Sequence, residues 1–273
     1  MSINNINVLE NHCKMNDKTL HLLPFSASRN RKKDFEIEKQ WGKFKLNLTA
    51  AETMNVVDLI TLSQMLQDYQ RNPSLWTDGG NIDSMVVLKR TLNIPNMVVS
   101  KELRNVRGNR ETILNSIDRW YKSALKFTNL ETGVEQNTRY IYQYTNVDPK
   151  KITDVIIFVH KGFLEFCLKN GLMFNFKRLM LYKNSYAQLL DAFLQGTKTV
   201  GAKKSGYRYR QAYSENLLLQ AIGLTDSEYD GYEQRKRLKN AFSELTKIGG
   251  LPVYVFDKIN VRWVRNDSKI SAK

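Results

Sequence analysis

Hydrogen-bond donors recur at helical spacing near the carboxyl-terminal end of the sequence. At about 100° per residue, a helix expected over residues 233–248 gathers them on its outer face: Lys236, Lys239, Asn240, Ser243 and Lys247. Arg235 and Arg237 flank this face. Asparagine can pair with adenine through two hydrogen bonds, arginine with guanine, and lysine and serine contact phosphates or bases. The pattern indicates a DNA-binding helix, although an isolated basic helix face is more often a solvated surface.

A second group of cations lies between Lys198 and Arg210, with no acidic residue among them. Tyr207 and Tyr209 are interleaved with these cations. Such a stretch suits a loop or hairpin that neutralises DNA phosphates. A plain flexible loop is the alternative. The candidate phosphate-binding side chains are Lys203, Lys204, Arg208 and Arg210.

A third donor face is expected on a helix over residues 110–127. Its apolar stripe includes Ile113, Ile117 and Trp120. The polar side chains opposite that stripe are Asn115, Arg119, Lys122 and Lys126. Asp118 and Glu111 lie on the same side and dilute its positive charge, so we expect mainly contacts to the DNA backbone from this helix.

Motifs for catalysis or metal binding are missing from the sequence. His12, His21 and His160 are far apart and show no His-x-His or His-Glu-x-x-His spacing. There is no Gly-x-x-x-x-Gly-Lys-Ser/Thr phosphate loop. His160 ends an apolar stretch, where a histidine is more often structural than a ligand. We therefore expect a binding protein with no catalytic residues, no metal site and no cofactor.

The overall charge favours a polyanionic partner. The 273 residues carry a formal net charge of +15, and the positive excess is spread over both halves of the chain. A folded, evenly basic protein is most simply explained by binding to nucleic acid. With 42% apolar residues and 11% aromatic residues, the composition excludes collagen-like, mucin-like and wholly disordered classes.

The cysteine count and the hydropathy pattern indicate which cellular compartment the protein occupies. Cys13, near an expected loose terminus, and Cys167 are the two cysteines, which argues against a disulfide scaffold or a zinc finger. No apolar run approaches 18 residues, so no membrane contact is expected. Residues 1–18 are polar and lack the apolar segment of a secretory signal. These features predict a cytoplasmic protein.

The first part of the chain predicts three helices followed by a β-ribbon. Residues 1–44 are expected to form a flexible arm with little regular structure. Thr49 and Glu52 suggest a capping box for a helix that ends at Asn72. Ser84 is expected to cap a short helix over residues 85–92, ahead of the helix over 110–127. Residues 138–145 and 152–160 then alternate as two strands do.

The same order recurs in the second part. It comprises a helix over residues 185–194, a short helix over 215–222 capped by Ser214, and the long helix, which ends at Gly249 and Gly250. A hairpin over residues 253–264 completes the unit. Three helices and a β-ribbon form the winged helix-turn-helix plan, in which the third helix enters the major groove. The predicted fold is therefore α+β, with two tandem winged helix-turn-helix domains at residues 45–168 and 169–273.

Several stretches resemble the iteron-binding plasmid replication initiator (Rep) proteins. In chain order they are residues 113–120, 155–158, 163–166, 183–190, 217–224, Tyr229 and residues 235–245. The resemblance covers about residues 45–265, in order and without large gaps. The helix that links the two domains in this family would fall near residues 161–168.

This resemblance implies that the chain binds direct repeats in double-stranded DNA at a plasmid origin and helps to open it. It also implies recruitment of a host initiator and helicase, and a monomer–dimer equilibrium in which the dimer represses its own gene. No bond would be made or broken by the protein itself. The alternatives are a winged-helix transcriptional regulator of a mobile element and, less favoured, a nicking replication enzyme.

Overall fold

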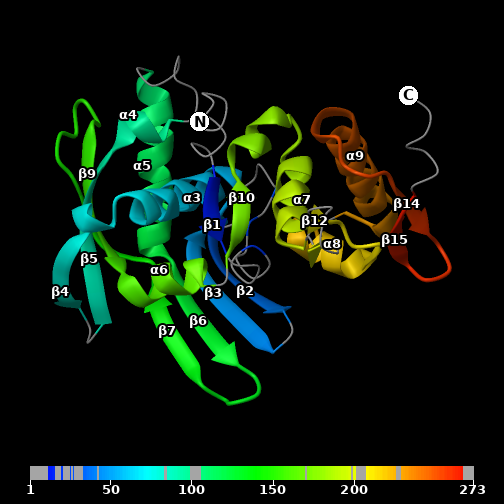
Figure 1. The fold of residues 1–273 in the computed structure, drawn as a ribbon, viewed down its shortest axis with the longest axis horizontal. Helices are drawn as coiled ribbons and strands as arrows, with labels where there is room; N and C mark the ends of the chain where they lie inside the picture. The colour runs from blue at the N-terminus through cyan, green and yellow to red at the C-terminus, as the bar shows by residue number, and fades with distance from the viewer. Residues whose placement is uncertain are drawn as a thin grey trace.

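The chain combines helices with small antiparallel sheets, which agrees with the predicted α+β class (Figure 1). The computed structural model describes residues 12–15, 20, 25, 27, 33–41, 43–82, 85–98, 106–169, 171–197, 199–200, 207–225 and 229–266. The elements up to α6 (Lys161–Leu168) lie on the left in Figure 1, and those from α7 onward lie on the right. Helix α6 occupies the residues at which the resemblance places the linking helix. The predicted domain boundary there stays a prediction.

Helix α3 (Val56–Arg71) begins later than the sequence predicted. The capping box is formed by Asn55 and Asp58, since the Asn55 side chain accepts a hydrogen bond from the backbone N–H of Val57 and Asp58 accepts one from that of Asn55. The prediction for Thr49 and Glu52 is wrong because both belong to strand β3 (Phe44–Glu52). The end of the helix at Asn72 is confirmed, directly before the 3₁₀ turn η1 (Pro73–Leu75).

Strand β3 belongs to a four-stranded antiparallel sheet. Its order is β2-β3-β6-β7, with β2 at Lys33–Trp41, β6 at Ala124–Asn129 and β7 at Glu135–Arg139. The expectation of little regular structure before residue 45 is therefore wrong for β2. Helix α5 (Arg107–Lys122) also ends before residue 127, because the segment that follows it pairs with β3 on one side and β7 on the other.

A second antiparallel sheet has the order β4-β5-β9-β8. It contains β4 (Thr77–Ile82), β5 (Met85–Asn93), β8 (Ile141–Asn146) and β9 (Asp154–His160). The predicted ribbon before His160 is confirmed as the β8–β9 pair. The predicted short helix over residues 85–92 is wrong, because β5 pairs with β9 from Val87 to Asn93. A short helix follows β5 instead: α4 (Ile94–Met97).

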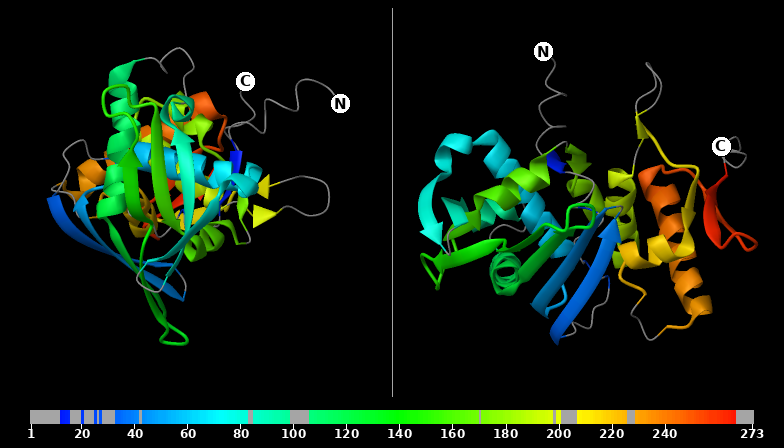
Figure 2. Two further views of the ribbon diagram at one scale, coloured as in Figure 1. Left: turned by 90° about the vertical axis from the view of Figure 1, so that its left-hand side faces the viewer. Right: turned by 90° about the horizontal axis from the view of Figure 1, so that it is seen from below.

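The carboxyl-terminal half follows its predicted order closely. Helices α7 (Ser185–Gly196), α8 (Glu215–Ala221) and α9 (Gly231–Gly249) are confirmed, and Ser214 caps α8 as predicted. The predicted hairpin is formed by β14 (Tyr254–Asp257) and β15 (Arg262–Arg265). Strand β13 (Ala212–Ser214) adds to it in the order β13-β15-β14. Short strands β11 (Thr199–Val200) and β12 (Tyr207–Arg208) pair, and η3 (Lys177–Leu181) precedes α7. Figure 2 places α9 and the hairpin at the opposite end of the molecule from the second sheet.

Strand β1 (His12–Met15) joins the amino-terminal segment to the carboxyl-terminal half. It pairs antiparallel with β10 (Leu172–Asn175), so His12 lies opposite Asn175. Gly171 packs against the backbone of Met15, where an added Cβ would lie 2.9 Å from the Met15 nitrogen. The Gln195 side chain of α7 exchanges hydrogen bonds with the backbone of Asn175. The expected loose terminus is therefore wrong for this strand, which is anchored in the core.

Burial of β1 predicts slow thiol chemistry at Cys13. Burial raises the pKa of the Cys13 thiol to about 12, and the thiolate is the reactive form. In a Cys167→Ala variant, we expect native Cys13 to react with a disulfide reagent at pH 8 on the order of a thousandfold more slowly than in denaturant. Equal rates in the two conditions would show that β1 does not stay paired with β10.

Candidate nucleic-acid interface

Helix α9 presents a continuous polar face to solvent. Its inner residues Leu238, Ala241, Phe242 and Leu245 are buried, which fixes the rotation of the helix about its axis. The amino terminus is capped by Asp230, whose side chain accepts a hydrogen bond of 2.8 Å from the Glu233 N–H. The predicted donor residues on the opposite face are all exposed: Lys236, Lys239, Asn240, Ser243 and Lys247.

Aromatic packing holds the β14–β15 hairpin beside this helix. The Phe242 ring stacks on Tyr254 at a centroid distance of 4.9 Å and packs on Trp263 at the same distance. Tyr254 also donates a hydrogen bond of 2.8 Å to the backbone carbonyl of Arg210. Helix, hairpin and the segment before β13 are thereby fixed relative to one another.

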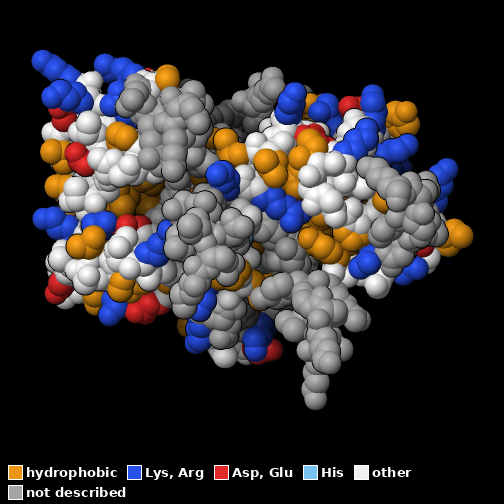
Figure 3. All heavy atoms as spheres, turned by 45° about the horizontal axis from the view of Figure 1, so that its top comes forward, with side chains coloured by type: hydrophobic (Ala, Val, Ile, Leu, Met, Phe, Trp, Pro, Cys, Tyr) orange, Lys and Arg blue, Asp and Glu red, His pale blue; other side chains and the backbone are white. Residues whose placement is uncertain are grey.

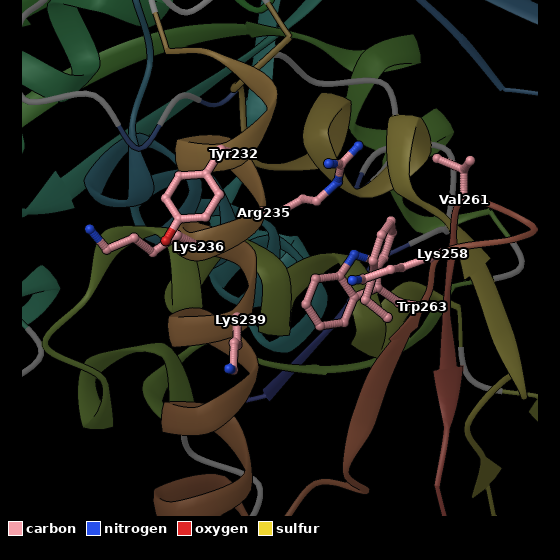
Figure 4. A pocket seen from close by; sticks show the side chains of 8 residues that line it. Tyr232, Arg235, Lys236, Lys239, Lys258, Val261 and Trp263 are labelled. Atoms are coloured by element: carbon pink, nitrogen blue, oxygen red, sulfur yellow. The ribbon is translucent and has the colours of Figure 1, made fainter.

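A groove of about 620 Å³ lies between α9 and the hairpin (Figure 4). Both walls combine cations with aromatic or apolar side chains. The helix contributes Tyr232, Arg235, Lys236 and Lys239, and the hairpin contributes Phe256, Lys258, Val261 and Trp263. A groove of this chemistry suits an anionic backbone with aromatic or apolar groups beside it.

The two flanking arginines have different surroundings. Arg235 pairs with Glu215 at 2.7 Å and lies over the Phe256 ring at 5.0 Å, on the edge of the groove. Arg237 faces the other way, with its guanidinium 3.9 Å from the Tyr229 ring centroid and paired with Glu233 at 3.2 Å. Arg235 can therefore contribute to the donor face, whereas Arg237 orients the start of α9.

The lysines of this face differ in whether an acidic side chain pairs with them. Lys236 makes a 3.4 Å contact with Glu233. No acidic side chain in the described part of the chain forms an ion pair with Lys239 or Lys247. In the view of Figure 3, lysine and arginine side chains lie at the right-hand end, over α9 and the hairpin, as well as at the left-hand end. This end of the molecule can attract an extended anion.

The predicted phosphate-binding stretch is described in part. Lys198, Lys203 and Lys204 lie outside the described residues, and of Arg208 only the backbone is described, in β12. Arg210 is exposed, with its guanidinium 5.7 Å from the Tyr213 ring centroid. Arg210 thus lies next to the strand that completes the β13-β15-β14 sheet.

The donor face predicted on α5 forms only in part. Asn115 and Lys122 are exposed, and Lys122 pairs with Asp118 at 2.6 Å. Arg119 is only 6% exposed and pairs with the fully buried Asp58 at 2.7 Å, so its placement on the outer face is wrong. Lys126 lies on β6 and pairs with Glu135 at 2.8 Å. These two residues leave the face because α5 ends at Lys122 and because Asp58 of α3 draws Arg119 inward.

His160 is buried at the end of β9, with its ring packed edge-on against Tyr142 at 6.1 Å. Burial lowers its pKa, since the charged form loses hydration. Among the described residues, no three His, Cys, Asp or Glu side chains gather closely enough to hold a metal ion. None of the helices in the described part combines the length and apolar character needed to span a bilayer.

Comparison with known proteins gives a structural likeness without a sequence likeness. No protein-family model matches the chain, and no curated protein matches it significantly in sequence. A crystal structure of selenomethionine derivatives of domains 2 and 3 of RctB matches with a TM-score of 0.52 and 12% identity, over 84% of this chain and 85% of that one. The chain shares its fold with these two RctB domains.

A second structure of RctB domains 2–3 agrees, with a TM-score of 0.51 and 12% identity over 93% of this chain and 98% of that one. The likeness to RctB therefore extends over most of both halves. At this identity RctB shows the fold alone, and the side chains on α9 and its groove are features of this sequence.

Sequence reasoning missed the hairpin side of the groove. Phe256, Lys258 and Trp263 are separated from α9 by a turn, and nothing in their local spacing marks them as neighbours of Lys239. A signal was present in the alternation of residues 253–264, which predicted the hairpin itself. Only the packing of Phe242 between Tyr254 and Trp263 brings the hairpin next to the helix.

Proposed function

We propose that this protein is a sequence-specific DNA-binding replication initiator that binds repeats at a plasmid origin. The fold that it shares with domains 2 and 3 of RctB supports a replication initiator role. The resemblance of residues 45–265 to the Rep proteins favours the same function independently.

The observation that carries the proposal is the exposed donor face of α9 beside the groove and hairpin. A major groove about 12 Å wide admits one helix, and Lys236, Lys239 and Asn240 are exposed on the face of α9 that would contact base edges and phosphates. The order α7, β13, α8, α9 and β14–β15 also supports the proposed winged-helix plan, in which α9 would be the recognition helix.

The two halves contribute unequally to this proposal. In the amino-terminal half, β5 replaces the expected second helix, and Arg119 and Lys126 are held in ion pairs. Asn115 and Lys122 stay exposed on α5 and can add contacts to the DNA backbone. Specific recognition is therefore assigned to α9, and the amino-terminal half to support and assembly.

We further propose that the protein acts without covalent chemistry. Binding of several copies to tandem repeats would deform the origin, and the host initiator and helicase would be recruited to the opened DNA. A monomer–dimer equilibrium would separate initiation from repression of its own gene. These steps follow the resemblance to the Rep proteins.

Footprinting of the full chain on DNA that flanks its own gene tests the proposal. We expect protected tandem repeats spaced by about two helical turns, roughly 21 base pairs. A plasmid carrying this region should replicate only when the protein is supplied, whereas a transcriptional regulator would bind without supporting replication. The absence of any protected site would overturn the DNA-binding proposal. Metal-dependent nicking of the supercoiled plasmid would point instead to a nicking enzyme.

A further inference from the structure

The tip of the β14–β15 hairpin exposes a large aliphatic side chain. Ile259 is 91% exposed, more than any other large hydrophobic residue in the described part of the chain. Its neighbours Lys258 and Asn260 are also exposed. Water contact of this extent is unfavourable for an aliphatic group. Burial of the Ile259 side chain by a partner would therefore lower the free energy.

The turn that carries Ile259 is rigidly built. One carboxylate oxygen of Asp257, Oδ1, accepts hydrogen bonds from the backbone N–H groups of Ile259 and Asn260, at 3.1 and 3.3 Å. The other oxygen, Oδ2, accepts from the Asn260 side-chain amide at 2.8 Å and from Nε of Arg262 at 3.1 Å. These hydrogen bonds fix the backbone of the tip without a partner, so the turn itself sets where the Ile259 side chain leaves the hairpin.

The turn is also strained and anchored to the body of the protein. Val261 has a φ of +46°, a conformation that β-branched residues rarely adopt. Its carbonyl accepts a hydrogen bond of 3.1 Å from the backbone N–H of Glu215, the first residue of α8. Strained backbone that the surrounding structure holds in place is a frequent feature of ligand-contacting segments.

The surroundings of Ile259 are those of a DNA-contacting element. Lys258 and Val261 line the groove beside the donor face of α9, so the tip lies on the same side as that helix. The Arg262 guanidinium forms an ion pair with the Asp257 carboxylate, so the charge of Asp257 is neutralised. Lys258 adds a positive charge next to Ile259. Exposed aliphatic side chains flanked by cations are used by minor-groove proteins to separate adjacent base pairs.

We infer that Ile259 is a wedge that enters the minor groove next to the major groove occupied by α9 and partly unstacks one base step. This inference rests on the proposed DNA-binding function. Lys258 would hold the adjacent phosphates while the ordered turn keeps the side chain extended. A pyrimidine–purine step is the expected target, since such steps unstack most easily.

The wedge would change DNA shape more than affinity. Contact between Ile259 and the bases is gained at the cost of unstacking them, so the two contributions largely cancel. Ile259→Ala should therefore reduce affinity by less than about tenfold, while it reduces the bend by roughly 20° or more. Ile259→Phe should retain the bend, because a phenyl ring can also act as a wedge.

The experiment uses the full chain and duplexes selected by it from a random-sequence pool. Energy transfer between dyes at the duplex ends measures the bend, and 2-aminopurine placed along the site reports unstacking by a rise in fluorescence. Ile248→Ala is the matched control, since Ile248 is 48% exposed near the far end of α9. We expect the wild type, Ile248→Ala and Ile259→Phe to bend and unstack the duplex, whereas Ile259→Ala should bend it less by roughly 20° or more and give no rise in 2-aminopurine fluorescence.

An unchanged bend and unchanged 2-aminopurine signal in Ile259→Ala would overturn the wedge. So would a straight duplex in the wild-type complex, although specific binding there would leave the proposed function standing. Loss of self-association in Ile259→Ala, with bending intact, would assign the tip to protein contact instead. Failure of the wild type to select any sequence would overturn the proposed function and the wedge together.

Discussion

Asn240→Ala is expected to weaken binding to the selected DNA site by about 1–3 kcal/mol, a loss of roughly 5- to 150-fold in affinity. Asn240 is exposed in the middle of the α9 donor face, where its amide can both donate to and accept from an adenine. Affinity for random DNA should change little, because non-specific binding depends on phosphate contacts. Titration of both duplexes at fixed salt measures the two effects.

Asn216→Ala provides the matched control, since Asn216 is also exposed but lies on α8. It should leave both affinities unchanged. Arg237→Ala should behave differently again, lowering the melting temperature because Arg237 packs on Tyr229 and pairs with Glu233. Equal affinity of wild type and Asn240→Ala for the selected site would remove Asn240 from the recognition surface.

Asp58→Ala is expected to reduce the free energy of unfolding by about 3–5 kcal/mol. The Asp58 carboxylate is fully buried, pairs with Arg119 at 2.7 Å and completes the capping box of α3. Its removal leaves the Arg119 guanidinium buried without its counter-charge, which is the costly outcome. Urea unfolding followed by circular dichroism measures the loss against a total of about 5–15 kcal/mol for an ordinary domain.

Two further variants separate the charge effect from simple loss of a side chain. Replacing both partners, as in Asp58→Asn with Arg119→Met, should cost less than Asp58→Ala, because no unpaired charge remains. Glu111→Ala removes the surface ion pair with Arg107 on the same helix, whose side chains are 45% and 61% exposed. It should cost less than about 1 kcal/mol. A double variant as unstable as Asp58→Ala would contradict this account.

The carboxyl-terminal half could be predicted because its signals are local. Helix α9 has an apolar stripe at positions 238, 241, 242 and 245, an acidic cap before it, and Gly250 in the left-handed conformation after it. The donor face followed directly from that periodicity. Each of these features depends on residues within a few positions of one another.

The amino-terminal half could not be predicted in the same way because tertiary pairing decides it. The apolar run in residues 85–92 fits a helix or a strand by local pattern, and its pairing with β9, about 60 residues later, selects the strand. Arg119 is drawn inward by Asp58, which is 61 residues away in sequence. Likewise Thr49 and Glu52 match a capping box, yet they lie on a strand paired on both sides.

The pairing of β1 with β10 sets an order of events during protein synthesis. Residues 12–15 leave the ribosome early, but their partners at 172–175 follow about 160 residues later. At about 5–20 residues per second, β1 waits roughly 8–30 s before it can pair. The other sheets of the amino-terminal half have all their strands within residues 33–160 and can assemble in that interval. Pairing of β1 with β10 is therefore a late step in folding. The amino-terminal strand is held in the sheet only after the first residues of the carboxyl-terminal half have been synthesised.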